Sequence, residues 1–212
     1  MCYFRSLILF NGIRIETYQK YSVGIVDNKE LTYCDIAKGH QFHGPYHDSE
    51  YGFPVEDESL LFERLTLEIF QAGLSWLIVL KKRQALNIAF KNFDVDSVAR
   101  FNQGDIDKLR NDKTIIRNKL KIESTIYNAN SILSIRQSHE TFAKWLFELS
   151  PLSKEEWCRV FKKKFKFIGG EIVGEFLMSI GYLKGAHHEK CPMYKKVKVL
   201  NPEWARVEIN KL

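Results

Sequence analysis

From Lys162 to Glu171 the sequence reads KKKFKFIGGE. Four lysines lead into a short apolar turn, two glycines follow, and the apolar spacing beyond them predicts a helix. Glycines let a phosphate approach the backbone, and the free amides at a helix start attract an anion. Lys166, Gly169 and Gly170 are therefore candidates for binding a nucleic-acid phosphate. The same pattern also fits an ordinary helical hairpin with a solvated run of charge.

Upstream of this run, apolar residues recur at helical spacing. Leu61, Leu65, Glu68 and Ala72 lie on one stripe of a helix that Gly73 ends. Further helices are expected over about 75–90, 96–110, 117–137 and 139–149, from a capping box at Ser153 and Glu156 to Lys164, and across Ile172, Phe176 and Ile180. The fold class is therefore predicted to be all-α, with about eight helices in short connections.

Two stretches near the N-terminus lack this helical pattern. Residues 1–31 hold alternating β-branched and aromatic residues, as from Ile13 to Tyr18, which are typical of half-buried strands. Residues 32–56 are rich in glycine, proline and histidine, and we expect an ordered loop there.

Composition bounds the class of protein. The 212 residues are 45% hydrophobic, enough for a core without disulfide staples, and the four cysteines are too scattered for a secreted scaffold. The net charge of +6 is compatible with nucleic acid but is also common in enzymes. Because no run approaches the roughly 20 apolar residues of a membrane span, and no signal-peptide pattern is present, we expect an intracellular protein that is not bound to a membrane.

One carboxylate stands on an apolar stripe. Glu68 points where a core should be, and an unpaired buried carboxylate is costly, so it needs a partner or a cavity. A lysine or a loop amide could satisfy it. Trp76 begins the next predicted helix, after the turn at Gly73, and is near enough to line the same cavity. An aromatic wall beside a carboxylate suits a flat base that carries positive charge.

Two thiols and two imidazoles form the ligand set of a closed tetrahedral zinc site. They come in pairs near the two ends of the chain: Cys34 with His47, and His187 with Cys191. Alternatively, His187 and Cys191 are surface residues and Cys34 is a buried thiol. His40, His43 and His188 also compete with His47 and His187 as the imidazole ligands. If the site exists, four protein ligands leave no position for water, which makes the metal structural and argues against a zinc-dependent hydrolase.

Several motifs then follow one another along the chain: YHDSEYG at Tyr46–Gly52, Leu67–Glu68, QAGLSW at Gln71–Trp76, LKKR at Leu80–Arg83, IIRN at Ile115–Asn118 and FKFIG at Phe165–Gly169. Together they resemble the DNA-3-methyladenine glycosylase I family over about residues 32–195. The resemblance implies one glycosylase domain over that range, with an extension at 1–31 and a tail at 196–212.

The resemblance also implies a helix-hairpin-helix DNA glycosylase fold in which a zinc site joins the N- and C-terminal segments. Its ligands are Cys34, His47, His187 and Cys191. Carried over position by position, Glu68 binds the excised base, and Tyr46 and Trp76 line its pocket. The turn that contains Gln71, Gly73 and Leu74 lies at the gap left in the DNA, and Gly169 and Gly170 lie at the phosphate-binding hairpin. The expected partner is double-stranded DNA with alkylated bases, bound by a monomer.

The chain departs from the family pattern at Ile36 and Tyr51, where the family usually carries tryptophan. A lesion-binding or purely DNA-binding protein of the same fold, with weak or lost excision, is therefore the alternative function. No aspartate that could assist the sugar cation occurs from Gly170 to Lys190, which agrees with the family that the chain resembles. No lysine is placed in the hairpin as a Schiff-base nucleophile would be. We therefore expect a monofunctional glycosylase, which hydrolyses the N-glycosidic bond of 3-methyladenine and leaves an abasic site.

Overall fold

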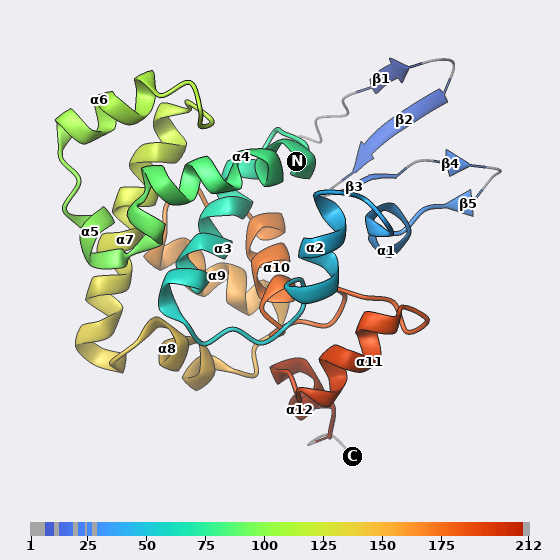
Figure 1. Ribbon diagram of the computed structural model, residues 1–212. Helices are drawn as coiled ribbons and strands as arrows, with labels where there is room; N and C mark the ends of the chain where they lie inside the picture. The colour runs from blue at the N-terminus through green and yellow to red at the C-terminus, as the bar shows by residue number, and fades with distance from the viewer. Residues whose placement is uncertain (1–6, 11–12, 19–20, 24, 27–28, 210–212) are drawn as a thin grey trace.

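The computed structural model describes the backbone of residues 7–10, 13–18, 21–23, 25–26 and 29–209, and the side chains of residues 31–206. From Tyr33 onward the described elements are all helical, which confirms the predicted fold class for this part of the chain (Figure 1). They are α1 (Tyr33–Ala37), α2 (His43–Ser49), α3 (Glu58–Gln71), α4 (Trp76–Ala89), the 3-10 helix η1 (Lys91–Phe93), α5 (Val95–Ala99), α6 (Gln103–Asn111), α7 (Lys119–His139), α8 (Phe142–Leu149), α9 (Lys154–Lys164), α10 (Gly170–Ser179), α11 (Pro192–Val199) and α12 (Glu203–Ile209).

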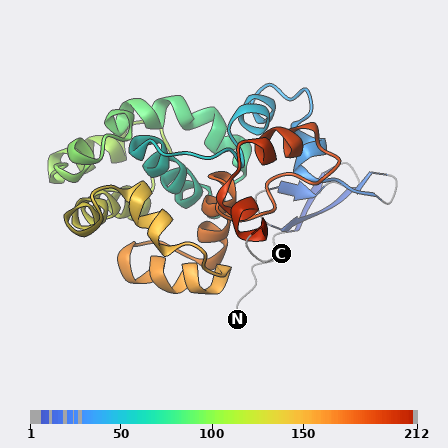
Figure 2. The same cartoon turned by 90° about the horizontal axis from the view of Figure 1, so that it is seen from below.

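The residues before α1 form two small antiparallel sheets. The strands are β1 (Leu7–Phe10), β2 (Ile13–Tyr18) and β3 (Tyr21–Val23) in one sheet, and β4 (Ile25–Val26) and β5 (Lys29–Glu30) in the other. In the first sheet, Leu7 pairs with Glu16 and Tyr18 with Tyr21. Both sheets lie beside α1 and α2, on the side of the molecule away from α5 to α8 (Figures 1 and 2). The N-terminal segment therefore joins the helical body next to Cys34.

Helix α3 is the centre of the core. Every residue from Leu61 to Phe70 is buried, including the charged side chains of Glu63, Arg64 and Glu68. Asp57 caps the helix by accepting a hydrogen bond from the amide of Leu60. Helices α4, α7, α8 and α10 pack around it. Because α3 is enclosed on all sides, any charged group on it needs a partner or a ligand.

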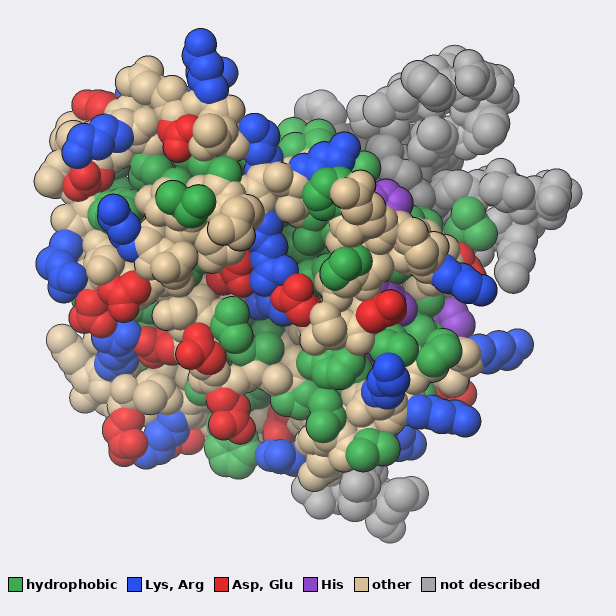
Figure 3. Space-filling model, in the orientation of Figure 1, with side chains coloured by type: hydrophobic (Ala, Val, Ile, Leu, Met, Phe, Trp, Pro, Cys, Tyr) green, Lys and Arg blue, Asp and Glu red, His purple; other side chains and the backbone are tan. Residues whose placement is uncertain are grey.

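The predicted helices correspond to α3 through α10. Ser153 and Glu156 make the capping box at the start of α9, with Glu156 accepting from the Ser153 amide at 2.8 Å. Gly73 ends the α3 segment with φ +81, a left-handed conformation that glycine adopts without strain. Acidic and basic side chains alternate over the face in Figure 3, and none of the described helices is long and apolar enough to cross a bilayer.

Residues 32–56 contain more helix than the predicted loop, which is a correction. Helix α1 begins after Thr32, whose side chain and Asp35 form a capping box. Helix α2 contains Gly44 and Pro45, which made this segment resemble a loop. Pro45 is the third residue of α2, so its missing amide removes no intrahelical hydrogen bond. At the other end of the chain, α11 and α12 form a small second core around Val197, Trp204 and Ala205.

The stretch KKKFKFIGGE joins α9 to α10 as a hairpin. Asn128, which is fully buried on α7, holds the turn: its side-chain oxygen accepts from the Lys166 amide at 2.8 Å and its side-chain nitrogen donates to the Lys166 carbonyl at 3.2 Å. Gly169 caps α10, and a side chain added there would meet no atom within 4 Å. The hairpin therefore presents an open backbone surface, and α10 packs directly on α3.

Candidate functional site

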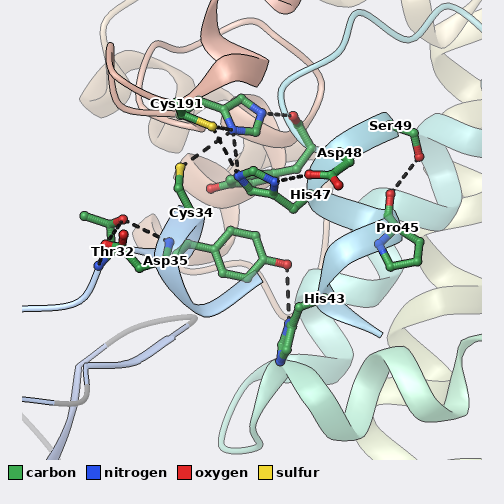
Figure 4. A network of polar contacts seen from close by, with 12 residues as sticks. Thr32, Cys34, Asp35, His43, Pro45, His47, Asp48, Ser49 and Cys191 are labelled. Carbon is green, nitrogen blue, oxygen red and sulfur yellow. Dashed lines mark hydrogen bonds and ion pairs between the residues drawn. The ribbon is translucent and has the colours of Figure 1, made fainter. Parts of the chain in front are cut away.

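The four candidate metal ligands converge from three segments. Cys34 lies on α1 and His47 on α2, while His187 and Cys191 lie between α10 and the start of α11 (Figure 4). One donor atom from each residue lies within 4.8 Å of all the others. His47, His187 and Cys191 are buried, and Cys34 is partly exposed. The residues predicted from two ends of the sequence are therefore one cluster.

The distances suit a tetrahedral ion. Nε2 of His47 lies 3.1 Å from Nδ1 of His187, and the Cys191 sulfur lies 3.7 Å from the first nitrogen and 3.8 Å from the second. The Cys34 sulfur lies 3.9 Å from Nδ1 of His187. Zinc with nitrogen at about 2.0 Å and sulfur at about 2.3 Å needs ligand atoms roughly 3.3–3.8 Å apart. The observed distances lie about this range, from 3.1 to 3.9 Å, so the cluster is consistent with a metal site.

The outer nitrogens of both imidazoles have acceptor partners. Nδ1 of His47 donates to the Asp48 carboxylate at 2.7 Å, and Nε2 of His187 donates to the Tyr51 carbonyl at 2.7 Å. These bonds place the proton of each neutral ring on the outer nitrogen, so that the inner lone pairs face the cluster. Burial lowers the pKa of His187 to about 4 and raises that of Cys34 to about 12.

The candidate base pocket is built by α2, α3 and α4. Tyr46 comes from α2, next to the ligand His47, Glu68 from the buried face of α3, and Trp76 from the first turn of α4. The Tyr46 and Trp76 ring centroids are 5.0 Å apart at an interplanar angle of 61°. The exposed fractions are 1% for Tyr46, 1% for Trp76 and 2% for Glu68. The pocket is therefore closed in this structure.

A network of ion pairs between two arginines and two glutamates lies next to Tyr46. Arg83 of α4 donates to Glu50 and to Glu63, each at 2.8 Å. Arg64 also donates to Glu50, at 2.5 Å, and its guanidinium lies 4.8 Å from the centre of the Tyr46 ring. Burial raises the pKa of Glu63, but the hydrogen bonds from Arg83 and Asn87 and the charge of Arg83 lower it by more. The pKa of Glu63 therefore lies below its usual range.

The predicted DNA-facing residues fall on two exposed turns. Gln71 is the last residue of α3, and Gly73 and Leu74 lie between α3 and α4, where Leu74 is 37% exposed. Lys166, Gly169 and Gly170 lie in the α9–α10 hairpin. Helix α7 touches both turns through Lys121, whose ammonium donates to the carbonyls of Phe70 and Ala72, at 2.7 and 2.6 Å. The Lys121 nitrogen is also 5.9 Å from the Phe167 ring centre.

Sequence reasoning missed Lys121, Arg64 and Tyr33. Lysine and arginine are usually exposed, so their burial on α7 and α3 has no signal in a single sequence. Tyr33 is the first residue of α1, and its phenol ring is only 5% exposed. Its position before Cys34 offered one cue, because a residue beside a buried ligand is held near the site.

A family model described as methyladenine glycosylase matches residues 36–159. DNA-3-methyladenine glycosylase 1 of Escherichia coli (strain K12) is 34% identical over 168 residues, which are 70% of this chain and 89% of the relative. DNA-3-methyladenine glycosylase of Haemophilus influenzae is 32% identical over 180 residues, covering 76% of this chain and 97% of the relative. The solved structure of 3-methyladenine DNA glycosylase I from Staphylococcus aureus superposes with a TM-score of 0.70 at 30% identity, covering 76% of this chain and 95% of that one.

Proposed function

This chain belongs to the methyladenine glycosylase family, and on that premise we propose that it excises 3-methyladenine from alkylated DNA by hydrolysing the N-glycosidic bond. The observation that carries the proposal is the Glu68 carboxylate, which is buried on α3 within the domain that matches these relatives. A solved relative superposing with a TM-score of 0.69 is described as a complex with 3-methyladenine, which supports a base pocket in this fold.

The chemistry follows from the charge of the lesion. Methylation at N3 makes adenine cationic, so the base is already a good leaving group and needs little help from an acid. An ionised Glu68 accepts hydrogen bonds from the base edge and favours the cationic form. Tyr46 and Trp76 supply flat apolar surfaces against which a purine packs. Binding energy from these groups offsets the cost of flipping the nucleotide out of the duplex.

We assign the DNA contacts to the two exposed turns. The Gln71–Leu74 turn fills the gap that the flipped nucleotide leaves, and Leu74 supplies the apolar contact. Lys166 and the backbone at Gly169 and Gly170 bind a phosphate, since α10 begins there with free amides and nearby lysines. Both turns are anchored to α7. The protein acts inside the cell as a monomer, on double-stranded DNA.

We also assign zinc to the cluster of Cys34, His47, His187 and Cys191. The donor set of two thiolates and two neutral imidazoles fits zinc, and four ligands close its coordination. When bound, the ion supplies structure: it fixes α1 and α2 to the segment before α11. His47 is next to Tyr46, so the same ion positions one wall of the pocket.

A base-release assay with Glu68→Gln tests the proposal. The amide keeps the shape but removes the negative charge, and we expect the release of 3-methyladenine from alkylated DNA to fall by about 100-fold or more. Glu148→Gln, on the surface of α8, is the matched control and should release base at the wild-type rate.

Gel retention of the same alkylated DNA separates excision from binding. Retention without release by the wild-type protein would favour the alternative of a lesion-binding protein without excision. Full activity in Glu68→Gln, with unchanged folding, would remove Glu68 from the mechanism.

A further inference from the structure

Tyr33 lies against the same side chains as the proposed base pocket. Its ring makes edge contacts with His43, His47 and Tyr51, with centroid distances of 5.6, 5.6 and 5.5 Å. Its hydroxyl lies 3.4 Å from Nδ1 of His43. The phenol thus enters the interior from α1, between the metal cluster and the pocket.

The hydroxyl of Tyr33 shares its surroundings with the proposed base-binding groups. Burial raises the pKa of this hydroxyl far above its usual range, and the nearby Tyr46 and Glu68 raise it further. A hydrogen bond from the Trp76 side chain acts in the opposite direction. Tyr51, which touches the Tyr33 ring, also packs on Tyr46 at a centroid distance of 5.6 Å, and Tyr46 packs on Trp76, so the phenol lies next to the residues to which we assign the base.

The proposed pocket has no room for a base while the phenol is in place. Glu68, Tyr46 and Trp76 are 1–2% exposed, and Tyr33 itself is 5% exposed. A space large enough for a purine would give these side chains far more accessible area. A purine that hydrogen-bonds to Glu68 must therefore displace a side chain that now covers it.

Tyr33 is the residue best placed to move. Glu68 and Trp76 lie on the 14-residue helices α3 and α4, and Tyr46 lies in the middle of α2, whereas Tyr33 is the first residue of the five-residue helix α1. Cys34, the next residue, belongs to the metal cluster, so α1 stays anchored and the side chain alone must rotate. We propose that Tyr33 occupies the base site of the free protein and swings out when a methylated base enters, an inference that rests on the proposed function.

Because Tyr33 must leave the site before a base can bind, it lowers the apparent affinity for every base. A ligand whose site is open in only a fraction of molecules binds more weakly by that fraction. A base that gains little from Glu68 does not offset the lost packing of the phenol, whereas a cationic base does. Tyr33 is then a specificity-determining residue, because it makes the pocket respond to the charge of the base.

Titration of free 3-methyladenine into the metal-loaded full-length protein tests the inference. In Tyr33→Leu we expect the dissociation constant to fall by about 10-fold if the site of the wild-type protein is open in about a tenth of molecules. The melting temperature should fall at the same time, since core packing is lost. A purely structural tyrosine would lower the stability and weaken binding together.

Two further variants complete the test. Tyr33→Phe keeps the ring and loses only the hydroxyl, so it should fold and bind the base more tightly by a smaller factor. Tyr182→Leu removes a half-buried phenol that packs on Trp157, and should lower the melting temperature without changing the base affinity.

The outcomes separate this inference from the proposed function. If both Tyr33 variants bind the base as the wild-type protein does, or more weakly, the role of Tyr33 is overturned. The proposed function still stands in that case, provided that Glu68→Gln loses excision. A crystal structure with 3-methyladenine bound and Tyr33 unmoved also overturns it. If neither the wild-type protein nor any variant binds or releases the base, both proposals fail.

Discussion

His47 and His187 meet nitrogen to nitrogen in the interior, with 3.1 Å between Nε2 of the first and Nδ1 of the second. Each ring donates its other N–H to an acceptor, His47 to Asp48 and His187 to the Tyr51 carbonyl. In their neutral forms the two rings therefore present lone pairs to one another. Such an approach is consistent with a metal site, in which Cys34 and Cys191 would supply the other two ligands.

The first prediction concerns this cluster. Protein purified without added metal should contain about one equivalent of zinc, and Cys34→Ser should retain roughly half or less, because a hydroxyl is a poor zinc ligand. Elemental analysis measures both. Cys158→Ser is the control, since Cys158 lies apart from the cluster, on α9, where its thiol donates to the Gly170 carbonyl at 3.8 Å. Equal zinc content in the two variants would remove Cys34 from the ligand set.

The second prediction concerns the hairpin. Lys166→Ala should weaken binding to duplex DNA and reduce the slope of log affinity against log salt concentration by about 1, because one phosphate contact is lost. Lys166 is exposed, and its ammonium lies 4.1 Å from the Tyr127 ring centre. Fluorescence anisotropy over a salt series gives both quantities.

Lys198→Ala is the control for this measurement, because Lys198 is equally exposed but lies on α11. If both substitutions change the slope equally, the hairpin has no special role and the lysines act through net charge alone.

The third prediction compares two arginines that both bind Glu50, the partly exposed Arg83 and the buried Arg64. Arg83→Met leaves Glu63, whose side chain is 3% exposed, without its ion-pair partner and should lower the free energy of unfolding by about 3–5 kcal/mol. Arg64→Met should cost much less. Glu50 keeps Arg83, and among the described residues Nε and Nη1 of Arg64 have no hydrogen-bond partner. Urea unfolding of both variants measures the difference, and equal losses would contradict this assignment.

Local pattern predicted the helices, and chemistry predicted the cluster. The stripe of Leu61 and Leu65 is a property of one helix, so it is visible in sequence. The thiols and imidazoles were recognisable because few residue types bind zinc. Tyr33 and Lys121 were not predictable, because their roles come from contacts across the fold. Lys121 binds a carbonyl 51 residues away, and no local period encodes such a contact.

The fourth prediction concerns Lys121, which connects α7 to the end of α3. Its side chain donates to the carbonyls of Phe70, just before the turn that we assign to the DNA gap, and of Ala72, within that turn. Lys121→Met removes both bonds and leaves the Phe70 carbonyl buried. We expect a loss of about 1–3 kcal/mol in the free energy of unfolding at pH 7. Excision should fall further than stability explains, because the turn loses its anchor.

The pH dependence of this variant provides a sharper test. Burial lowers the pKa of Lys121 to about 8, against about 10.4 in an unfolded chain. Between these values the unfolded state binds more protons, so the free energy of unfolding rises with pH. The charge-burial cost is fully present below pH 8 and is relieved as the pH rises, while the neutral amine still donates to both carbonyls. The stability of wild type relative to Lys121→Met should therefore increase between pH 7 and pH 9.5, by at most about 1.4 kcal/mol per pH unit. Urea unfolding of both proteins across this range measures it, and a constant or decreasing difference would show that Lys121 is not a buried ammonium.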